Sequence, residues 1–117
     1  MSDLGKRLIA SVRKFAAEQP DYIYKNADNN YPWKVGCVYF TKDGNPSCLI
    51  GHALTDLGLL SAQPDICGTS SINNVVKQYG WEIDSRELEW LVDVQMFQDS
   101  LKTWGQAVAL ADEADRL

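Results

Sequence analysis

The chain has 117 residues, of which 45% are hydrophobic and 23% charged, and its net charge is −5. This length suits a single domain spanning residues 1–117, and the composition excludes a disordered chain. No apolar run approaches the roughly 20 residues that a membrane-spanning helix requires, and the first residues carry no secretory signal. We therefore expect a cytoplasmic protein whose three cysteines are thiols, with one disulfide and one free thiol as the alternative.

The first predicted element is an amphipathic helix over residues 3–18. Apolar residues recur there at helical spacing, with basic residues mostly between them. Ser2 or Asp3 can cap its start, because a short polar side chain at that position accepts a hydrogen bond from the first turn. Pro20 cannot continue a helix, so we expect the helix to end before it.

A short β-hairpin or strand pair is predicted near residues 35–50. Residues 35–41 are rich in side chains that favour strands. The segment 42–46 that follows has the Asp-Gly and proline chemistry of a tight turn. Residues 47–57 either begin with a short returning strand or enter a helix directly. We favour the helix, with Asn45 or Ser47 near its cap and Gly58 just past its end.

Three more helices are predicted in the second half of the chain. The first ends at Gly80, because glycine suits the left-handed position after a helix. The second begins after Asp84. Glu87 has the spacing of a capping box, in which its carboxylate accepts a hydrogen bond from the Asp84 N–H. Thr103 caps the last helix. The expected fold is therefore α+β and helix-dominated, with about five helices and one short hairpin.

The cysteines and the single histidine fall within one window of the chain, as Cys37, Cys48, His52 and Cys67. Three thiolates and an imidazole form a recognised zinc set, and Cys48 and His52 share a helix face because they are four residues apart. The spacing to Cys37 and Cys67 does not suit the close ligand pairs of most zinc sites. We therefore expect no metal and no cofactor, and favour cysteines that act as small buried apolar residues, with structural zinc as an alternative.

A cysteine-dependent enzyme is a second alternative at the same residues. Cys48 is expected near the start of a helix, where the helix dipole favours a reactive thiolate. His52 would have to act as the base, but it lies one turn along the same helix and cannot also reach a leaving group. No other histidine is present, so we favour a protein that is not an enzyme and assign no catalytic residue.

Acidic residues are concentrated in the C-terminal part of the chain. Residues 1–80 contain eight Lys or Arg against seven Asp or Glu, whereas residues 81–117 contain three against nine. Such a surface repels phosphate backbones, which argues against nucleic acid as a partner and favours a basic protein surface. Glu89 and Asp93 lie four apart on a helix face expected to be in water, so we predict them in an interface and not as a catalytic pair.

Trp90 and Trp104 are the predicted anchors of this interface. Tryptophan is enriched both in protein cores and among the residues that dominate binding energy. Trp90 lies off the main apolar stripe of its helix, so this helix either packs on two sides or presents one side to a partner. Both possibilities stay open at the level of the sequence.

Two pairs of segments resemble a family of small uncharacterised proteins of actinobacteria and their phages. Residues 37–39 and 43–54 contain a strand-like cysteine segment and a Cys-x-x-Gly-x-Ala-Leu pattern that starts at Cys48. Residues 95–99 and 103–108 resemble the closing segment of the same family, a Gln-Asp turn followed by a helix that begins with tryptophan. The resemblance implies a bacterial or phage cytoplasmic protein, and it implies no activity and no catalytic residue.

The predicted function is therefore a small accessory protein that acts by protein–protein interaction through its acidic C-terminal helices. Its partner would be a host or phage protein, and no membrane would be involved. The predicted interface residues are Glu89, Trp90, Asp93 and Trp104. The alternative is a small cysteine-dependent enzyme or a structural zinc domain that uses Cys48 and His52.

Overall fold

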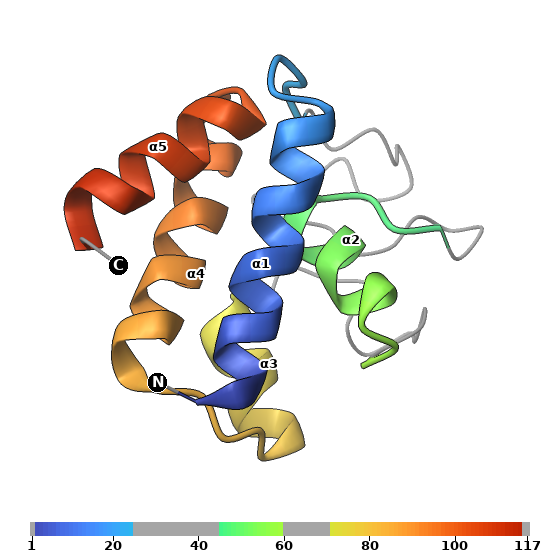
Figure 1. Ribbon diagram of the computed structural model, residues 1–117, viewed down its shortest axis with the longest axis vertical. Helices are drawn as coiled ribbons and strands as arrows, with labels where there is room; N and C mark the ends of the chain where they lie inside the picture. Colours follow the sequence, from blue (N-terminus) through green and yellow to red (C-terminus); the bar gives the residue numbers. More distant parts are fainter. Residues whose placement is uncertain (1, 25–44, 60–70, 116–117) are drawn as a thin grey trace.

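Five helices surround one buried apolar cluster. The computed structural model describes residues 2–24, 45–59 and 71–115 (Figure 1). The helices are α1 (Asp3–Glu18), α2 (Leu49–Asp56), α3 (Ile72–Tyr79), α4 (Ser85–Asp99) and α5 (Trp104–Asp115). In Figure 1, α1 runs between the pair α4 and α5 on one side and α2 on the other, and it contacts all three. α4 is central, because it contacts each of the other four helices.

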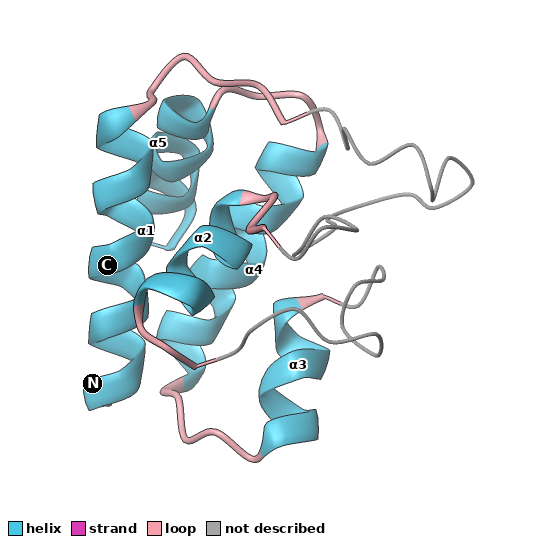
Figure 2. Ribbon diagram, turned by 90° about the vertical axis from the view of Figure 1, so that its right-hand side faces the viewer, coloured by secondary structure: helices cyan, strands magenta, loops and turns pink. Residues whose placement is uncertain are grey.

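The predicted α+β fold class is wrong, since the structure is all-α over its described ranges. Figure 2 shows helices and loops in those ranges and no strand. In place of the returning half of the hairpin, the chain enters α2, the helix favoured for residues 47–57. Cys48 Sγ accepts a hydrogen bond from the Gly51 N–H at 3.4 Å, which caps this helix. The other half of the hairpin, residues 35–41, lies outside the described residues.

The local start and stop signals are confirmed at several helix ends. Ser2 caps α1, because its Oγ accepts a hydrogen bond from the Gly5 N–H at 3.2 Å. Asp84 caps α4 in the same way through the Arg86 N–H, at 2.9 Å. Gly80 closes α3 with a φ of 66°, a left-handed conformation that glycine adopts without a Cβ clash.

α5 begins with a complete capping box. Thr103 Oγ1 accepts a hydrogen bond from the Gln106 N–H, and Gln106 Oε1 accepts one from the Thr103 N–H, both at 3.0 Å. The carbonyls of Tyr22 and Pro20 accept hydrogen bonds from the first two N–H groups of α5, at 2.9 and 3.0 Å. The segment that follows α1 therefore holds the start of α5 in place.

Two buried glutamines of α4 accept hydrogen bonds from the starts of other helices. Gln95 Oε1 accepts from the Ile72 N–H that begins α3, at 2.9 Å, and Gln98 Oε1 accepts from the Leu49 N–H that begins α2, at 2.8 Å. The first N–H groups of a helix have no partner within that helix, so a buried helix start requires an acceptor from elsewhere. α4 therefore positions the starts of α2 and α3.

Glu87 of α4 binds the start of α1 and not the start of its own helix. Its Oε1 accepts hydrogen bonds from the N–H and the hydroxyl of Ser2, at 3.0 and 2.7 Å, and Ser2 Oγ accepts one from the Asp84 N–H at 3.2 Å. The capping box predicted for Asp84 and Glu87 is therefore wrong in its second half. Glycine at position 5 leaves room for this contact, because a Cβ there would lie 2.6 Å from Glu87 Cδ.

Candidate functional site

Cys48 is disulfide-bonded and has no exposed surface. The expectation that the cysteines are thiols is thus wrong for Cys48, and the other two, Cys37 and Cys67, lie outside the described residues. A sulfur in a disulfide is neither a nucleophile nor a zinc ligand, so the structure supports neither alternative through Cys48. Over the described residues, no group of three or more His, Cys, Asp or Glu side chains is arranged to hold a metal ion.

His52 lies in a cluster of aromatic rings. The centroid of its ring is 5.2 Å from that of Phe15 on α1 and 5.5 Å from that of Trp104 on α5, with the rings of His52 and Trp104 edge to face. Burial lowers the pKa of His52, and the nearby Glu18 carboxylate opposes this effect only in part. The ring is therefore neutral at pH 7, and its packing joins α2 to α1 and α5.

Trp90 and Trp104 are core residues, with exposed fractions of 0% and 1%. Their predicted role as surface anchors is wrong, because a side chain without exposed area cannot bury further area against a partner. Trp90 Nε1 donates a hydrogen bond to Asp112 at 2.9 Å, and Trp104 Nε1 donates one to Gln98 at 3.2 Å. Trp90 is buried although it lies off the main apolar stripe of α4. The reason is that α4 has neighbouring helices on several sides, so two faces of this helix are buried.

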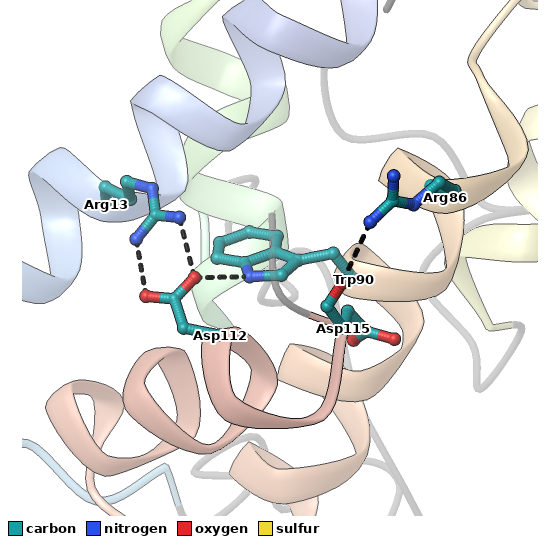
Figure 3. A network of polar contacts seen from close by, with 5 residues as sticks. All are labelled: Arg13, Arg86, Trp90, Asp112 and Asp115. Carbon is teal, nitrogen blue, oxygen red and sulfur yellow. Dashed lines mark hydrogen bonds and ion pairs between the residues drawn. The ribbon is translucent and has the colours of Figure 1, made fainter.

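An ion pair between α1 and α5 closes over Trp90 (Figure 3). Arg13 donates two hydrogen bonds to the Asp112 carboxylate, at 2.8 and 2.7 Å, and its guanidinium carbon lies 4.9 Å from the centre of the Trp90 ring. The hydrogen bonds to Arg13 lower the pKa of Asp112, and they raise the pKa of Arg13. Asp112 is therefore already neutralised within the fold and does not contribute a free negative charge to the surface.

The described parts of the segments that carry the family resemblance meet at one buried glutamine. Gln98 Oε1 accepts hydrogen bonds from Leu49, which follows Cys48, and from Trp104, which begins α5. Gln98 Nε2 donates to Asp99 at 3.0 Å, which orients the amide. The cysteine, Gln-Asp and tryptophan motifs are thus explained by how α2, α4 and α5 pack together, with no need for a catalytic role.

The acidic groove is a hollow of about 590 Å³ beside the first half of α4. Its lining residues are Asn73, Ser85, Leu88, Glu89, Val92, Asp93 and Asp115. Leu88 and Val92 are its apolar residues, one helical turn apart. Glu89 is exposed and Asp93 half-buried, and neither belongs to an ion pair among the described residues. The structure thus brings the two predicted acidic residues to one hollow.

Asp115, on the last turn of α5, forms a carboxyl pair with Asp93 of α4. Burial, a hydrogen bond with Asp93 and the charge of Asp93 together raise the pKa of Asp115 to about 6, and Arg86 opposes the shift. Asp115 Oδ2 is buried and has no hydrogen-bond partner among the described residues. Arg86 donates a hydrogen bond to the backbone carbonyl of Asp115 at 3.4 Å, which holds the end of α5 against α4 (Figure 3).

This carboxyl pair was not predicted from the sequence. The pair considered there was Glu89 with Asp93, because these residues are one helical turn apart. The short connection between α4 and α5 could have indicated that Asp115 lies near Asp93. It makes α5 return antiparallel along α4, so the end of α5 lies beside the first half of α4.

A smaller hollow of about 290 Å³ lies between α1 and α2. Its charges are already paired, because Asp56 accepts hydrogen bonds from Lys14 and Ser11 at 2.9 and 2.8 Å, and these bonds lower the pKa of Asp56. Binding a charged ligand there would require these contacts to break. The acidic groove is therefore the stronger candidate for a binding site.

Comparisons of the chain with protein-family models, curated proteins and solved structures return no match. The resemblance to proteins of actinobacteria and their phages therefore remains a prediction from short motifs. No helix in the described ranges is long and apolar enough to cross a membrane.

Proposed function

We propose that the protein acts by binding a basic segment of another protein in the acidic groove. The observation that carries this proposal is the combination of apolar surface from Leu88 and Val92 with the carboxyl groups of Glu89, Asp93 and Asp115. Apolar surface contributes affinity when it is buried, whereas carboxyl groups without internal cations select and attract a positively charged partner.

The charge of the C-terminal part supports a basic partner. Residues 81–117 contain nine acidic residues against three basic ones. At physiological ionic strength this field extends about 8 Å into solvent, so it speeds association with a basic surface and makes the rate depend on salt. The same charges repel nucleic acid, which is why a protein is the proposed partner.

The spacing of the apolar residues in the acidic groove suits one face of a helix. Leu88 and Val92 lie one turn apart on α4, so two apolar side chains at the same spacing on a partner helix can contact both. Lysine or arginine residues beside them would then reach Glu89, Asp93 and Asp115. The proposed occupant is therefore a basic amphipathic helix.

The resemblance to actinobacterial and phage proteins supplies the proposed setting, an accessory protein that binds a host or phage protein in the cytoplasm. The disulfide at Cys48 argues against the cytoplasm, because disulfides persist mainly in oxidising compartments. Trapping of thiols in protein taken from its own cells decides this point. A modified Cys48 supports the cytoplasm, and an unmodified, disulfide-bonded Cys48 favours an oxidising compartment.

The direct test is the binding of a synthetic amphipathic peptide that carries leucines and lysines on one face, measured by fluorescence anisotropy. Reversing both charges in a Glu89→Lys/Asp93→Lys variant should weaken binding by about tenfold or more, mainly by slowing association. Since both side chains are partly or wholly in water, the melting temperature should stay close to that of the unmodified protein.

The matched control is Glu18→Lys/Asp21→Lys, which makes the same change in net charge at exposed positions away from the acidic groove. This control should bind the peptide almost as well as the unmodified protein. A peptide with glutamate in place of lysine should not bind. Equal losses in the two double variants would refute the acidic groove as the site, because net charge alone would then explain the effect.

A further inference from the structure

The acidic groove contains a carboxyl pair that can hold a proton, and the inference drawn from it rests on the proposed function. We propose that Asp93 and Asp115 share one proton in the free protein, and that a cationic side chain of the partner takes the place of this proton. The proton leaves to solvent when the partner binds. Binding is then tighter at neutral than at mildly acidic pH.

The geometry of the pair carries this proposal. Asp93 belongs to the middle of α4 and Asp115 to the last turn of α5, and both line the acidic groove. Because Asp115 Oδ2 is buried without a hydrogen-bond partner among the described residues, an ionised Asp115 would leave this oxygen unpaired beside a second carboxylate. A proton removes this cost, since a protonated carboxyl group donates a hydrogen bond to the other.

The charges on α4 do not neutralise the pair. Arg86 donates a hydrogen bond to the backbone carbonyl of Asp115 at 3.4 Å, and its charge opposes the raised pKa of the Asp115 carboxyl only in part. Glu89, one turn before Asp93, adds a further negative charge to the same groove. A positive charge from outside would therefore be favoured at this place.

In the described part of the chain, the helices packed against α4 do not supply that positive charge. α5 carries Asp112 one turn before the pair, and this carboxylate is already bound by Arg13 of α1. α3 contributes the uncharged Asn73 to the lining, with the exposed Lys77 one turn further along. Among the described residues that line the acidic groove there is no lysine or arginine.

The raised pKa of Asp115 sets the size of the expected effect. With a pKa of about 6, roughly one molecule in eleven has lost the shared proton at pH 5, and roughly ten in eleven have lost it at pH 7. If the partner's cation requires the proton to leave, the apparent affinity rises about tenfold over this range. The stability of the free protein moves in the opposite direction: the contribution of Asp115 is fully present below its unfolded pKa of 3.8 and is lost as the pH rises through about 6.

Asp115→Asn tests the proposal, because an amide has nearly the same shape and donates permanently to Asp93. It therefore imitates the protonated pair. Glu113→Gln is the matched control, since it removes the same charge from an exposed position on α5. Two quantities are measured between about pH 5 and pH 7: the affinity for the leucine–lysine peptide, and the titration of the Asp115 carboxyl carbon by NMR in the unmodified protein.

The unmodified protein and Glu113→Gln should bind the peptide about tenfold more tightly at pH 7 than at pH 5. Asp115→Asn should bind the peptide with nearly the same affinity at both pH values, and this affinity should be close to the weaker one that the unmodified protein has at pH 5. The carboxyl carbon of Asp115 should titrate with a midpoint near 6 in the free protein and at a lower pH when the peptide is bound. The NMR measurement does not depend on whether Asp115→Asn folds.

The outcomes separate this inference from the proposed function. Peptide binding that is the same at pH 5 and pH 7, or an Asp115 midpoint near the unperturbed 3.8, overturns the shared proton and leaves the proposed function intact. No peptide binding at any pH overturns the proposed function and, with it, the replacement of the proton by a partner's cation.

Discussion

Replacement of Gln98 by alanine tests whether one buried amide holds the starts of two helices in place. Gln98 has no exposed surface, and its Oε1 accepts hydrogen bonds from the Leu49 N–H at 2.8 Å and from Trp104 Nε1 at 3.2 Å. In the Gln98→Ala variant both donors stay buried without an acceptor, and a cavity takes the place of the amide group. The variant should therefore be strongly destabilised.

The magnitude follows from these two contacts. A buried donor left without a partner costs about 1–3 kcal/mol, and the longer bond to Trp104 belongs at the lower end of that range. The cavity adds about 1 kcal/mol, because the surroundings collapse only in part. The free energy of unfolding should thus fall by about 3–5 kcal/mol, which corresponds to a decrease in the melting temperature of roughly 10–20 °C for a chain of this size.

Thermal and urea unfolding followed by circular dichroism measure this loss. Gln78→Ala is the matched control, because Gln78 is exposed on α3 and its removal should change the stability by about 0.5 kcal/mol at most. If Gln98→Ala unfolds within about 1 kcal/mol of the unmodified protein, these hydrogen bonds do not hold the helices together. The Gln-Asp motif would then need an explanation other than packing.

Two further predictions concern the core and the start of α1. Trp90→Ala should cost about 3–5 kcal/mol of stability, because a fully buried indole and its hydrogen bond to Asp112 are both lost. A native-like melting temperature of this variant would show that Trp90 is not a core residue. Gly5→Ala should lower the melting temperature although alanine is the better helix former, since its Cβ would lie 2.6 Å from Glu87 Cδ. The loss caused by Gly5→Ala should be smaller when residue 87 is already alanine, because the contact is then absent. An equal loss in the two backgrounds would show that the contact is not its cause.

The helices could be predicted because their ends depend on residues close in sequence. The helix predicted over residues 3–18 is α1 with the same bounds, and Gly80 ends α3 as expected. The helix favoured after residue 47 is α2, and it ends before Gly58 as expected. The local pattern did not identify the acceptor of its first N–H, because Gln98 is 49 residues away in the chain.

The capping box at the start of α4 shows where local spacing misleads. Asp84 and Glu87 have the right residue types three apart, and Asp84 does cap the helix. The carboxylate of Glu87 is bound instead by Ser2, because α1 begins beside α4 and offers both an N–H and a hydroxyl. Two donors from another helix compete successfully with one N–H of the same helix.

The sequence by itself determined the helical segments, the excess of acidic residues after position 80 and the placing of Glu89 and Asp93 on one helix face. Only the tertiary structure decided that Trp90 is buried, that Cys48 forms a disulfide bond, and that Asp115 lies beside Asp93. Helix starts, helix ends and faces follow from neighbours within one or two turns. Burial and carboxyl pairing depend on how α5 returns along α4 and on what α1 covers, and these contacts join residues that no local pattern connects.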